Sequence, residues 1–205
     1  MEVLVVTGGI GSGKSEVCRI LSDAFSCGVY NADAKVKSLY DTHPTLLSDI
    51  ENRSGRILRD EEGRFLPKKL AEVIFSDRRQ LELVESLVFP LLESDFEAWK
   101  HEYMDDRFVV FESATILEKP QLKGLGDKVV LVDAPFEVRL ERACRRDKAS
   151  EVSIRARMMN QKLMNAISAG EVVPEVDAVI DNSGKEDELK TNVMNMVRNL
   201  FEDIL

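Results

Sequence analysis

Two patterns of apolar residues alternate along this chain and predict strands separated by helices. Short runs rich in Val, Ile and Leu recur with amphipathic segments between them, an order typical of a parallel sheet flanked by helices. We predict five strands, at residues 3–6, 28–30, 108–111, 128–132 and 178–180. The fold class is therefore α/β, with a five-stranded parallel sheet flanked by helices.

Helical spacing of apolar residues follows the first strand, at residues 16–25, and recurs at the end of the chain. Residues 186–205 carry one apolar stripe, which we interpret as core packing rather than as a surface for a partner.

A long helical stretch separates the second and third predicted strands. It covers about 75 residues, and the apolar spacing over residues 83–99 suggests one long helix. Pro90 is expected to kink or split that helix. Gly55 and Gly63 mark a loop. We interpret residues 34–105 as a helical insertion that binds a second substrate.

A glycine-rich segment lies between the first strand and the helix that follows. Residues 8–15 read G-G-I-G-S-G-K-S and fit the phosphate-binding pattern G-x-x-x-x-G-K-[ST]. Glycines let backbone N–H groups turn toward phosphate oxygens, and the helix N-terminus favours an anion. Lys14 would reach the β- and γ-phosphates of ATP, and the Ser15 hydroxyl would bind Mg²⁺. The alternative is an accidental Gly-rich turn.

A carboxylate follows the second strand, in the segment Asn31-Ala32-Asp33. Phosphoryl transfer needs an oriented nucleophile, so Asp33 could accept a proton from an attacking hydroxyl or hold a water bound to Mg²⁺. The alternative is that Asp33 is the N-cap of the next helix.

A basic run follows the fourth strand. Arg142 and Arg146 are four residues apart and share a helix face, where two guanidinium groups would stabilise a transferring phosphate. The alternative is a solvated face with salt bridges, because Glu137 and Glu141 lie within one turn. The run consists of Arg139, Arg142, Arg145, Arg146 and Lys148.

Two further segments complete the candidate site. Residues 142–170 could form a lid that closes on the nucleotide and excludes water. Residues 181–184 read D-N-S-G, a turn signature that could offer backbone groups of Asn182 to an adenine edge.

Composition argues against nucleic-acid-binding, secreted, membrane-spanning and zinc-binding proteins. The chain has 205 residues, 44% of them hydrophobic, which suits one domain or one domain with an insertion. The net charge of −9 argues against nucleic acid as a main partner. The sequence shows no signal peptide and no apolar stretch long enough for a membrane span. Three cysteines without C-x-x-C spacing indicate reduced thiols in a cytoplasmic protein, with no disulfide framework or zinc site.

With these residues identified, the chain resembles the dephospho-coenzyme A kinase family, which has the P-loop NTPase fold. The resemblance rests on residues 7–15, 31–33, 87–90, 112–118, 142–147 and 177–184, in this order. It implies transfer of the γ-phosphoryl group of ATP to the 3′-hydroxyl of dephospho-coenzyme A. It also implies one domain over residues 1–205, with a core sheet, a helical insertion and a lid. We place the core at about 1–33, 106–141 and 171–205, the insertion at about 34–105 and the lid at about 142–170.

The resemblance also implies site residues. Asp33 would be the base or the partner of the metal, and Arg142 and Arg146 would be the lid arginines. The ATP phosphates would be held by Gly11, Ser12, Gly13, Lys14, Ser15 and Glu16.

Four features depart from the family pattern. Glu16 replaces the usual Thr, Asn31 replaces the first Asp of a D-A-D segment, and Phe89 replaces a common His. Residues 115–118, T-I-L-E, differ from the family's L-L-F-E. The departures at 31 and 89 bear on acceptor binding rather than on the ATP site.

Two other functions stay open at this point. The first is another small-molecule kinase on the same scaffold, such as one for nucleoside monophosphates. The second is a nucleotide-binding switch without enzymatic activity. We expect a monomer or small homo-oligomer that uses ATP and Mg²⁺.

Overall fold

The computed structural model describes residues 1–161, 164, 166–167, 170–171 and 173–201. Backbone contacts divide the chain into two compact units. Unit 1 comprises Met1–Asn31 and Tyr103–Leu205, and unit 2 comprises Ala32–Glu102.

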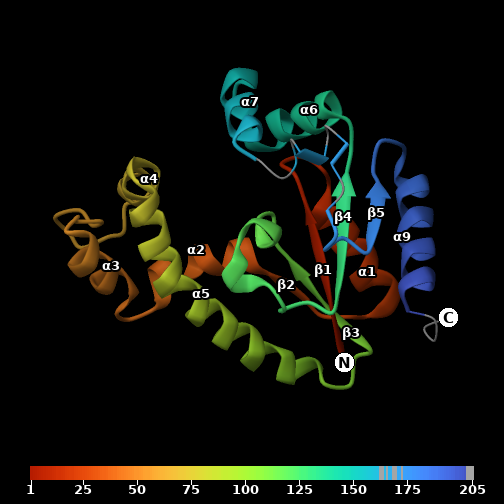
Figure 1. Ribbon diagram of the computed structural model, residues 1–205, viewed down its shortest axis with the longest axis horizontal. Coiled ribbons are helices and arrows are strands. Elements are labelled where there is room, and N and C mark those ends of the chain that lie inside the picture. Colours follow the sequence, from red (N-terminus) through yellow and green to blue (C-terminus); the bar gives the residue numbers. More distant parts are fainter. Residues whose placement is uncertain (162–163, 165, 168–169, 172, 202–205) are drawn as a thin grey trace. The chain divides into compact units, whose positions relative to one another are not determined.

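Unit 1 is built around a five-stranded, fully parallel sheet (Figure 1). The order of the strands is β2-β3-β1-β4-β5, so β1 lies at the centre. The chain runs from β1 to one side of the sheet and later crosses to the other side, and ligands bind at such a switch point beside the carboxyl ends of the strands. The predicted sheet is confirmed. The strands are β1 (Glu2–Gly8), β2 (Val29–Asn31), β3 (Phe108–Glu112), β4 (Lys128–Asp133) and β5 (Ala178–Asp181).

Each of the strands β2, β3, β4 and β5 ends at a polar residue, one position beyond the end of the strand predicted from the apolar pattern. Asn31 pairs in register with Glu112, and Asp133 pairs with Asp181. Backbone pairing does not require an apolar side chain, so the ladder continues to the edge of the sheet. The register therefore brings polar side chains from neighbouring strands together at the carboxyl edge.

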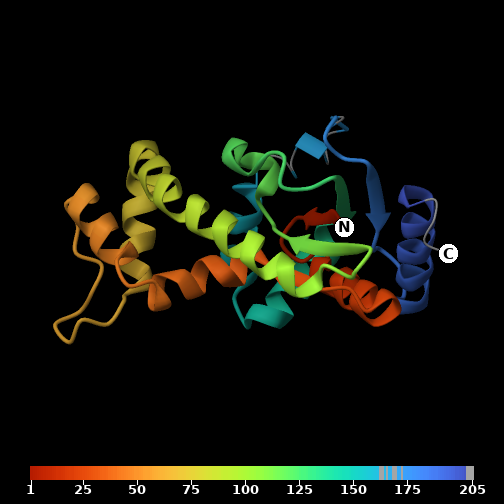
Figure 2. The same ribbon diagram turned by 90° about the horizontal axis from the view of Figure 1, so that it is seen from below.

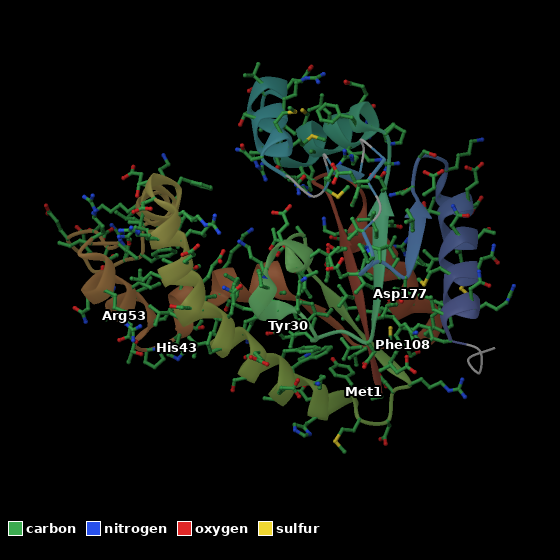
Figure 3. The ribbon with its side chains drawn as sticks, in the orientation of Figure 1. Met1, Tyr30, His43, Arg53, Phe108 and Asp177 are labelled. Carbon is green, nitrogen blue, oxygen red and sulfur yellow. The ribbon has the colours of Figure 1, made fainter. Side chains whose placement is uncertain are left out.

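One face of the sheet packs against the helices α1 (Lys14–Phe25) and α9 (Glu186–Leu200). The apolar stripe of α9 is buried in this core, which confirms its interpretation as core packing. The rings of Phe108, which Figure 3 labels, and Phe201 stack with their centroids 5.0 Å apart. The predicted helix reached residue 205, but α9 ends at Leu200, and residues 202–205 lie outside the described part of the chain.

The helices α6 (Phe136–Asp147) and α7 (Glu151–Met159) follow β4 and share a small apolar cluster. The predicted lid, residues 142–170, thus begins inside α6, and its residues 162–163, 165 and 168–169 lie outside the described ones. Among the described residues there are also three short 3₁₀ helices: η1 (His101–Tyr103), η2 (Ile116–Glu118) and η3 (Pro120–Leu122).

Unit 2 is helical (Figure 2). It has an apolar cluster of its own, which includes Leu46, Ile50 and Val88. A loop that contains Gly55 and Gly63 joins its second and third helices. The helices are α2 (Ala32–Thr42), α3 (Leu46–Ser54), α4 (Pro67–Ser76) and α5 (Arg78–Lys100).

Pro90 lies inside α5 and does not split it, contrary to that part of the prediction. A proline removes one helical hydrogen bond. The buried residues Val84 and Val88 before it, and Leu92 and Phe96 after it, keep both halves packed. Packing on both sides of the proline outweighs the local cost.

The three cysteines, Cys18, Cys27 and Cys144, are free, as predicted. Burial raises the pKa of Cys27 to about 11. No helix in the described part of the chain combines the length and apolar character that a membrane crossing requires.

Candidate active site

The glycine-rich loop joins the end of β1 to the start of α1, at the centre of the sheet edge. Gly11 and Gly13 have φ angles of 76° and 96°, in the left-handed region that favours glycine. Gly13 is the N-cap of α1, and no side chain caps this helix. The first turn of α1 therefore presents backbone N–H groups to an anion. The N–H of Glu16, by contrast, donates to the carbonyl of Gly13 at 3.0 Å.

Lys14 folds back over the first half of the loop. Its Nζ donates to the carbonyl oxygens of Gly8 at 2.9 Å and Gly9 at 3.1 Å. These bonds hold the ammonium group beside the loop amides. A bound phosphate would meet a charge that is already in position.

The hydroxyl of Ser15 contacts a carboxylate to which the sequence analysis assigned no role. Ser15 Oγ donates to Oε1 of Glu112 at 2.7 Å, and Asn31 Nδ2 donates to Oε2 of Glu112, also at 2.7 Å. Glu112 is only 6% exposed, so both carboxylate oxygens are satisfied inside the protein. The signal that could have identified Glu112 is a charged residue directly after an apolar strand.

These donors fit a magnesium ion that arrives with a nucleotide. A hydroxyl and a carboxylate are hard oxygen ligands, and Mg²⁺ is commonly held by one or two carboxylates together with substrate phosphates and waters. Among the described residues, no group of three or more His, Cys, Asp or Glu side chains could hold a metal by itself. Ser15 and Glu112 therefore suit a shared ion better than a resident one.

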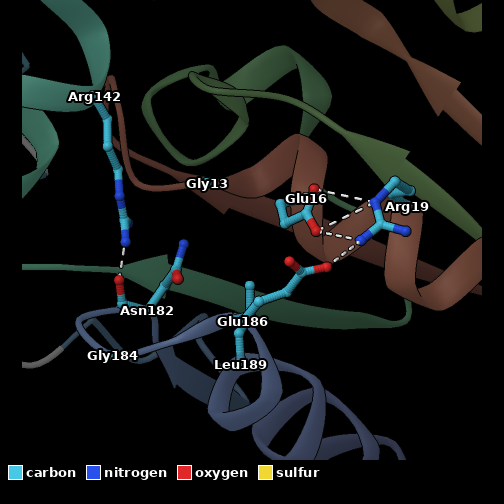
Figure 4. Close-up of a pocket in the computed structure, with 8 residues that line it drawn as sticks. All are labelled: Gly13, Glu16, Arg19, Arg142, Asn182, Gly184, Glu186 and Leu189. Carbon is cyan, nitrogen blue, oxygen red and sulfur yellow. Dashed lines mark hydrogen bonds and ion pairs between the residues drawn. The ribbon is translucent and has the colours of Figure 1, made fainter. Parts of the chain in front are cut away.

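A pocket of about 420 Å³ adjoins the Gly13 end of the loop (Figure 4). Asn182 is 6% exposed and connects the pocket wall to the loop: Asn182 Nδ2 donates a hydrogen bond to the carbonyl of Ser12 at 2.7 Å. Its backbone is also engaged: the carbonyl accepts from Arg142 Nη1, and the N–H donates to the carbonyl of Asp133, both at 2.8 Å. The pocket is lined by Gly13, Glu16, Arg19, Arg142, Asn182, Gly184, Glu186 and Leu189.

The carboxylate of Glu16 turns away from the loop toward Arg19, which also bonds Glu186 (Figure 4). The hydrogen bond from Arg19 holds the pKa of Glu16 below its ordinary value. The guanidinium group offsets negative charge beside the phosphate loop.

The two predicted lid arginines have different partners. Arg142 reaches Asn182 at the pocket, whereas Arg146 Nε bonds Asp147 at 2.7 Å. Arg157 also bonds Asp147. Hydrogen bonds from Arg146 and Arg157 lower the pKa of Asp147 to about 2.

The alternative of a salt-bridged surface describes part of the same run. Arg145 pairs with Glu141, and the two side chains are 76% and 72% exposed. That pair is a surface ion pair, while Arg142 faces the pocket.

Arg139 is a second residue that the sequence did not single out as a site residue. It is 3% exposed and lies against Gly9 and Gly11, where any Cβ atom would overlap atoms of Arg139. Its Nε is 3.9 Å from Oδ1 of Asp133, too far for a hydrogen bond. Burial lowers the pKa of Arg139, an effect that Asp133 partly opposes.

The segment after α7 also touches the loop. Gln161 Oε1 accepts a hydrogen bond from the N–H of Ile10 at 2.8 Å. This contact links the predicted lid to the phosphate loop.

Asp33 lies in unit 2, in the first turn of α2. The helix begins one residue earlier, at Ala32, so Asp33 is not its N-cap. Its role as base or metal partner stays a prediction.

Comparison with known proteins gives a consistent result. The sequence profile of the dephospho-CoA kinase family matches residues 2–188. A dephospho-CoA kinase of Porphyromonas gingivalis is 38% identical over 162 residues, which cover 79% of this chain and 78% of that protein. A dephospho-CoA kinase of Aquifex aeolicus is 30% identical over 203 residues, which cover 99% of this chain and 100% of that protein.

Solved structures share the fold. A crystal structure of a Thermus thermophilus protein superposes with a TM-score of 0.80 at 24% identity, covering 97% of both chains. Dephospho-CoA kinase from Campylobacter jejuni gives 0.64 at 21% identity, covering 99% of this chain and 98% of that one. A shikimate kinase from Acinetobacter baumannii gives 0.54 at 13% identity, covering 100% and 96%. The predicted P-loop kinase fold is confirmed.

Proposed function

Because this chain belongs to the dephospho-CoA kinase family, we propose that its glycine-rich loop and the side chains around it carry out that family's reaction. The enzyme is an ATP-dependent kinase that transfers the γ-phosphoryl group to the 3′-hydroxyl of dephospho-coenzyme A. The products are coenzyme A and ADP. The observation that carries the assignment of roles is the convergence of Lys14, Ser15 and Glu112 on one loop beside a pocket.

The loop binds the triphosphate in this proposal. Backbone N–H groups of Gly11, Gly13, Lys14 and Ser15, together with the ammonium of Lys14, surround the phosphates, so the charge of the transferring group meets fixed donors. The pocket beside Gly13 takes the nucleoside, with Arg142 and Asn182 in its wall.

Ser15 and Glu112 would hold the magnesium ion that accompanies the nucleotide. When bound, the ion would supply positive charge to offset the negative charge that develops during transfer. The serine hydroxyl and the carboxylate provide oxygen atoms from two elements that the sheet register holds together.

Asp33 accepts the proton of the attacking hydroxyl, and unit 2 binds the acceptor. Support comes from the position of Asp33 two residues after Asn31, in the segment that resembles the family's D-A-D. General-base catalysis contributes about 10²–10⁴-fold to rate, so Asp33→Asn is expected to lower the turnover number by that factor.

Arg146 takes part in phosphoryl transfer only if its guanidinium group leaves Asp147 and binds a phosphate instead. The exposed fraction of its side chain, 61%, leaves it accessible for that exchange. Arg142 needs no such exchange, because it already faces the pocket.

The test is a phosphoryl-transfer assay with purified protein, MgATP and a panel of acceptors. We expect product from dephospho-coenzyme A and little from nucleoside monophosphates. Preference for a nucleoside monophosphate would favour the alternative kinase, and tight ATP binding without transfer to any acceptor would favour a switch. Asp41→Asn, a change to an exposed carboxyl on the same helix as Asp33, is the matched control.

We also propose that the enzyme works in the cytoplasm as a monomer or small homo-oligomer and binds no nucleic acid. The acidic net charge of −9 supports the absence of a nucleic-acid partner. Cell fractionation and light scattering would test location and assembly.

A further inference from the structure

Arg139 is an almost fully buried cation that lacks hydrogen bonds at Nε. Its side chain is 3% exposed, and the nearest carboxylate, on Asp133, is 3.9 Å away. A buried guanidinium group is normally paired and hydrogen-bonded, because leaving water is costly for a charge. The position of Arg139 therefore needs an explanation beyond packing.

The phosphate loop and Asp133 also carry buried polar atoms without hydrogen-bond partners. Among the described residues, the buried side-chain atoms without a hydrogen-bond partner are Ser12 Oγ, Gln80 Oε1, Asp133 Oδ1 and Arg139 Nε. Three of these four belong to the phosphate loop or to residues beside it. Such a concentration indicates a site whose polar groups find their partners when a ligand binds.

Arg139 lies at one particular end of the loop. Its guanidinium Nη1 lies against Gly9, and its backbone lies against Gly11. Lys14 Nζ also bonds the carbonyl oxygens of Gly8 and Gly9. The pocket for the nucleoside lies at the other end, beside Gly13.

A triphosphate that starts at the Gly13 pocket and follows the loop would bring its last phosphate toward Gly9. Lysines at the position of Lys14 reach the β- and γ-phosphates, which agrees with this direction. Arg142, one turn after Arg139 on α6, bonds Asn182 at the nucleoside end. The helix thus presents one arginine to each end of the loop.

We propose that Arg139 is a phosphate-binding residue that recognises the terminal phosphate of ATP and so separates ATP from ADP. The inference rests on the proposed function only in taking ATP as the nucleotide. Without nucleotide, the buried guanidinium group lowers the stability of the fold. With a γ-phosphate bound, the same group gains an anionic partner.

The experiment uses the full chain and three substitutions, Arg139→Met, Arg139→Gln and Arg139→Lys. The matched control is Arg145→Met, which removes the same charge from an exposed position on the same helix. Calorimetry with Mg²⁺ and no acceptor gives the affinities for ADP and for the β,γ-imido analogue of ATP. Thermal unfolding without nucleotide gives stability.

We expect Arg139→Met to lower the affinity for the triphosphate analogue by about tenfold or more, because the loss of one charged hydrogen bond has about that effect. The affinity for ADP should fall by less than about threefold. The melting temperature without nucleotide should be equal to or above that of the wild type, since an apolar side chain of similar length replaces a buried charge. Arg139→Lys should keep most of the triphosphate affinity, and the control should keep both affinities.

Equal losses for the two nucleotides, or an unchanged affinity for the triphosphate, would overturn the proposal. If Arg139→Met does not fold, the ratio of the two affinities in Arg139→Gln decides the question. Failure of the kinase assignment would look different, because the wild type would then bind both nucleotides without phosphorylating dephospho-coenzyme A.

Discussion

Ser15 donates its hydroxyl hydrogen to Glu112 at 2.7 Å, across 97 positions of sequence. The contact exists because β1 leads directly into the loop that carries Ser15, and β3 is paired with β1 and ends at Glu112. The same carboxylate accepts a hydrogen bond from Asn31 on β2. Three neighbouring elements of unit 1 thus orient one buried carboxylate toward the phosphate loop.

Glu112→Gln should lower the rate of phosphoryl transfer by about 10²-fold and raise the Mg²⁺ concentration needed for half-maximal rate, because the proposed metal ligand loses its charge. Rates measured over a Mg²⁺ titration check this. Glu141→Gln, at an exposed position, serves as the control. An unchanged Mg²⁺ dependence in the Glu112 variant would show that the carboxylate does not serve the metal.

Asn31→Asp should destabilise the protein without metal by roughly 1–2 kcal/mol, because two like charges would face each other across adjacent strands. Mg²⁺ alone, without nucleotide, should then stabilise the variant more than the wild type, since the ion binds between the carboxylates. Thermal unfolding with Mg²⁺, and with Na⁺ at equal ionic strength, measures both effects. If Mg²⁺ shifts the two melting temperatures equally, residue 31 lies outside the metal's reach.

Lys14→Met should leave the fold intact and reduce turnover by about 10²-fold or more, because the loop loses the charge that faces the phosphates. Steady-state kinetics and ATP calorimetry measure the two effects. Lys190→Met, an exposed lysine on α9, is the control. Wild-type ATP affinity and turnover in the Lys14 variant would remove the loop from the mechanism.

Gly11→Ala and Gly63→Ala form a matched pair, since their φ angles are 76° and 79°. Both substitutions cost about 1 kcal/mol for an alanine in the left-handed region. At Gly63 the new Cβ meets nothing within 4 Å, whereas at Gly11 it overlaps the backbone of Arg139. We expect Gly11→Ala to lose more stability and to lose ATP binding as well, as unfolding and calorimetry would report. Equal losses of stability would contradict the packing argument.

Asp147→Asn should reduce stability at neutral pH by less than about 1 kcal/mol, because its partners Arg146 and Arg157 are mostly exposed. The folded-state pKa of Asp147, about 2, lies below the ordinary 3.8, so its contribution is present above pH 4 and lost as pH falls toward 2. Melting temperatures of variant and wild type should therefore converge over that interval. A difference that persists below pH 2 would have another cause.

The predicted strands were right in number and place but stopped at the last apolar residue. The structure continues them to Asn31, Glu112, Asp133 and Asp181. An apolar pattern reports which side chains are buried in the core, while strand pairing depends on backbone hydrogen bonds. The residues omitted for this reason include Glu112, the carboxylate that meets Ser15.

Arg139 shows a different limit of the sequence. It stood in the basic run beside Arg142 and Arg145, and periodicity assigns all three to one helix. The structure separates them into a buried cation, a pocket residue and a surface ion pair. Helical spacing gives the directions in which these side chains leave the helix relative to one another. Only the packing of α6 against the loop decides which of the side chains is buried.

The sequence by itself determined the alternating α/β order, the phosphate loop at residues 8–15 and the family, because these depend on local spacing and on residue types in order. Tertiary structure decided which distant residues complete the loop, namely Glu112, Asn182 and Arg139. Their contacts arise from strand order and register and from how α6 packs on the loop, and no short stretch of sequence encodes these.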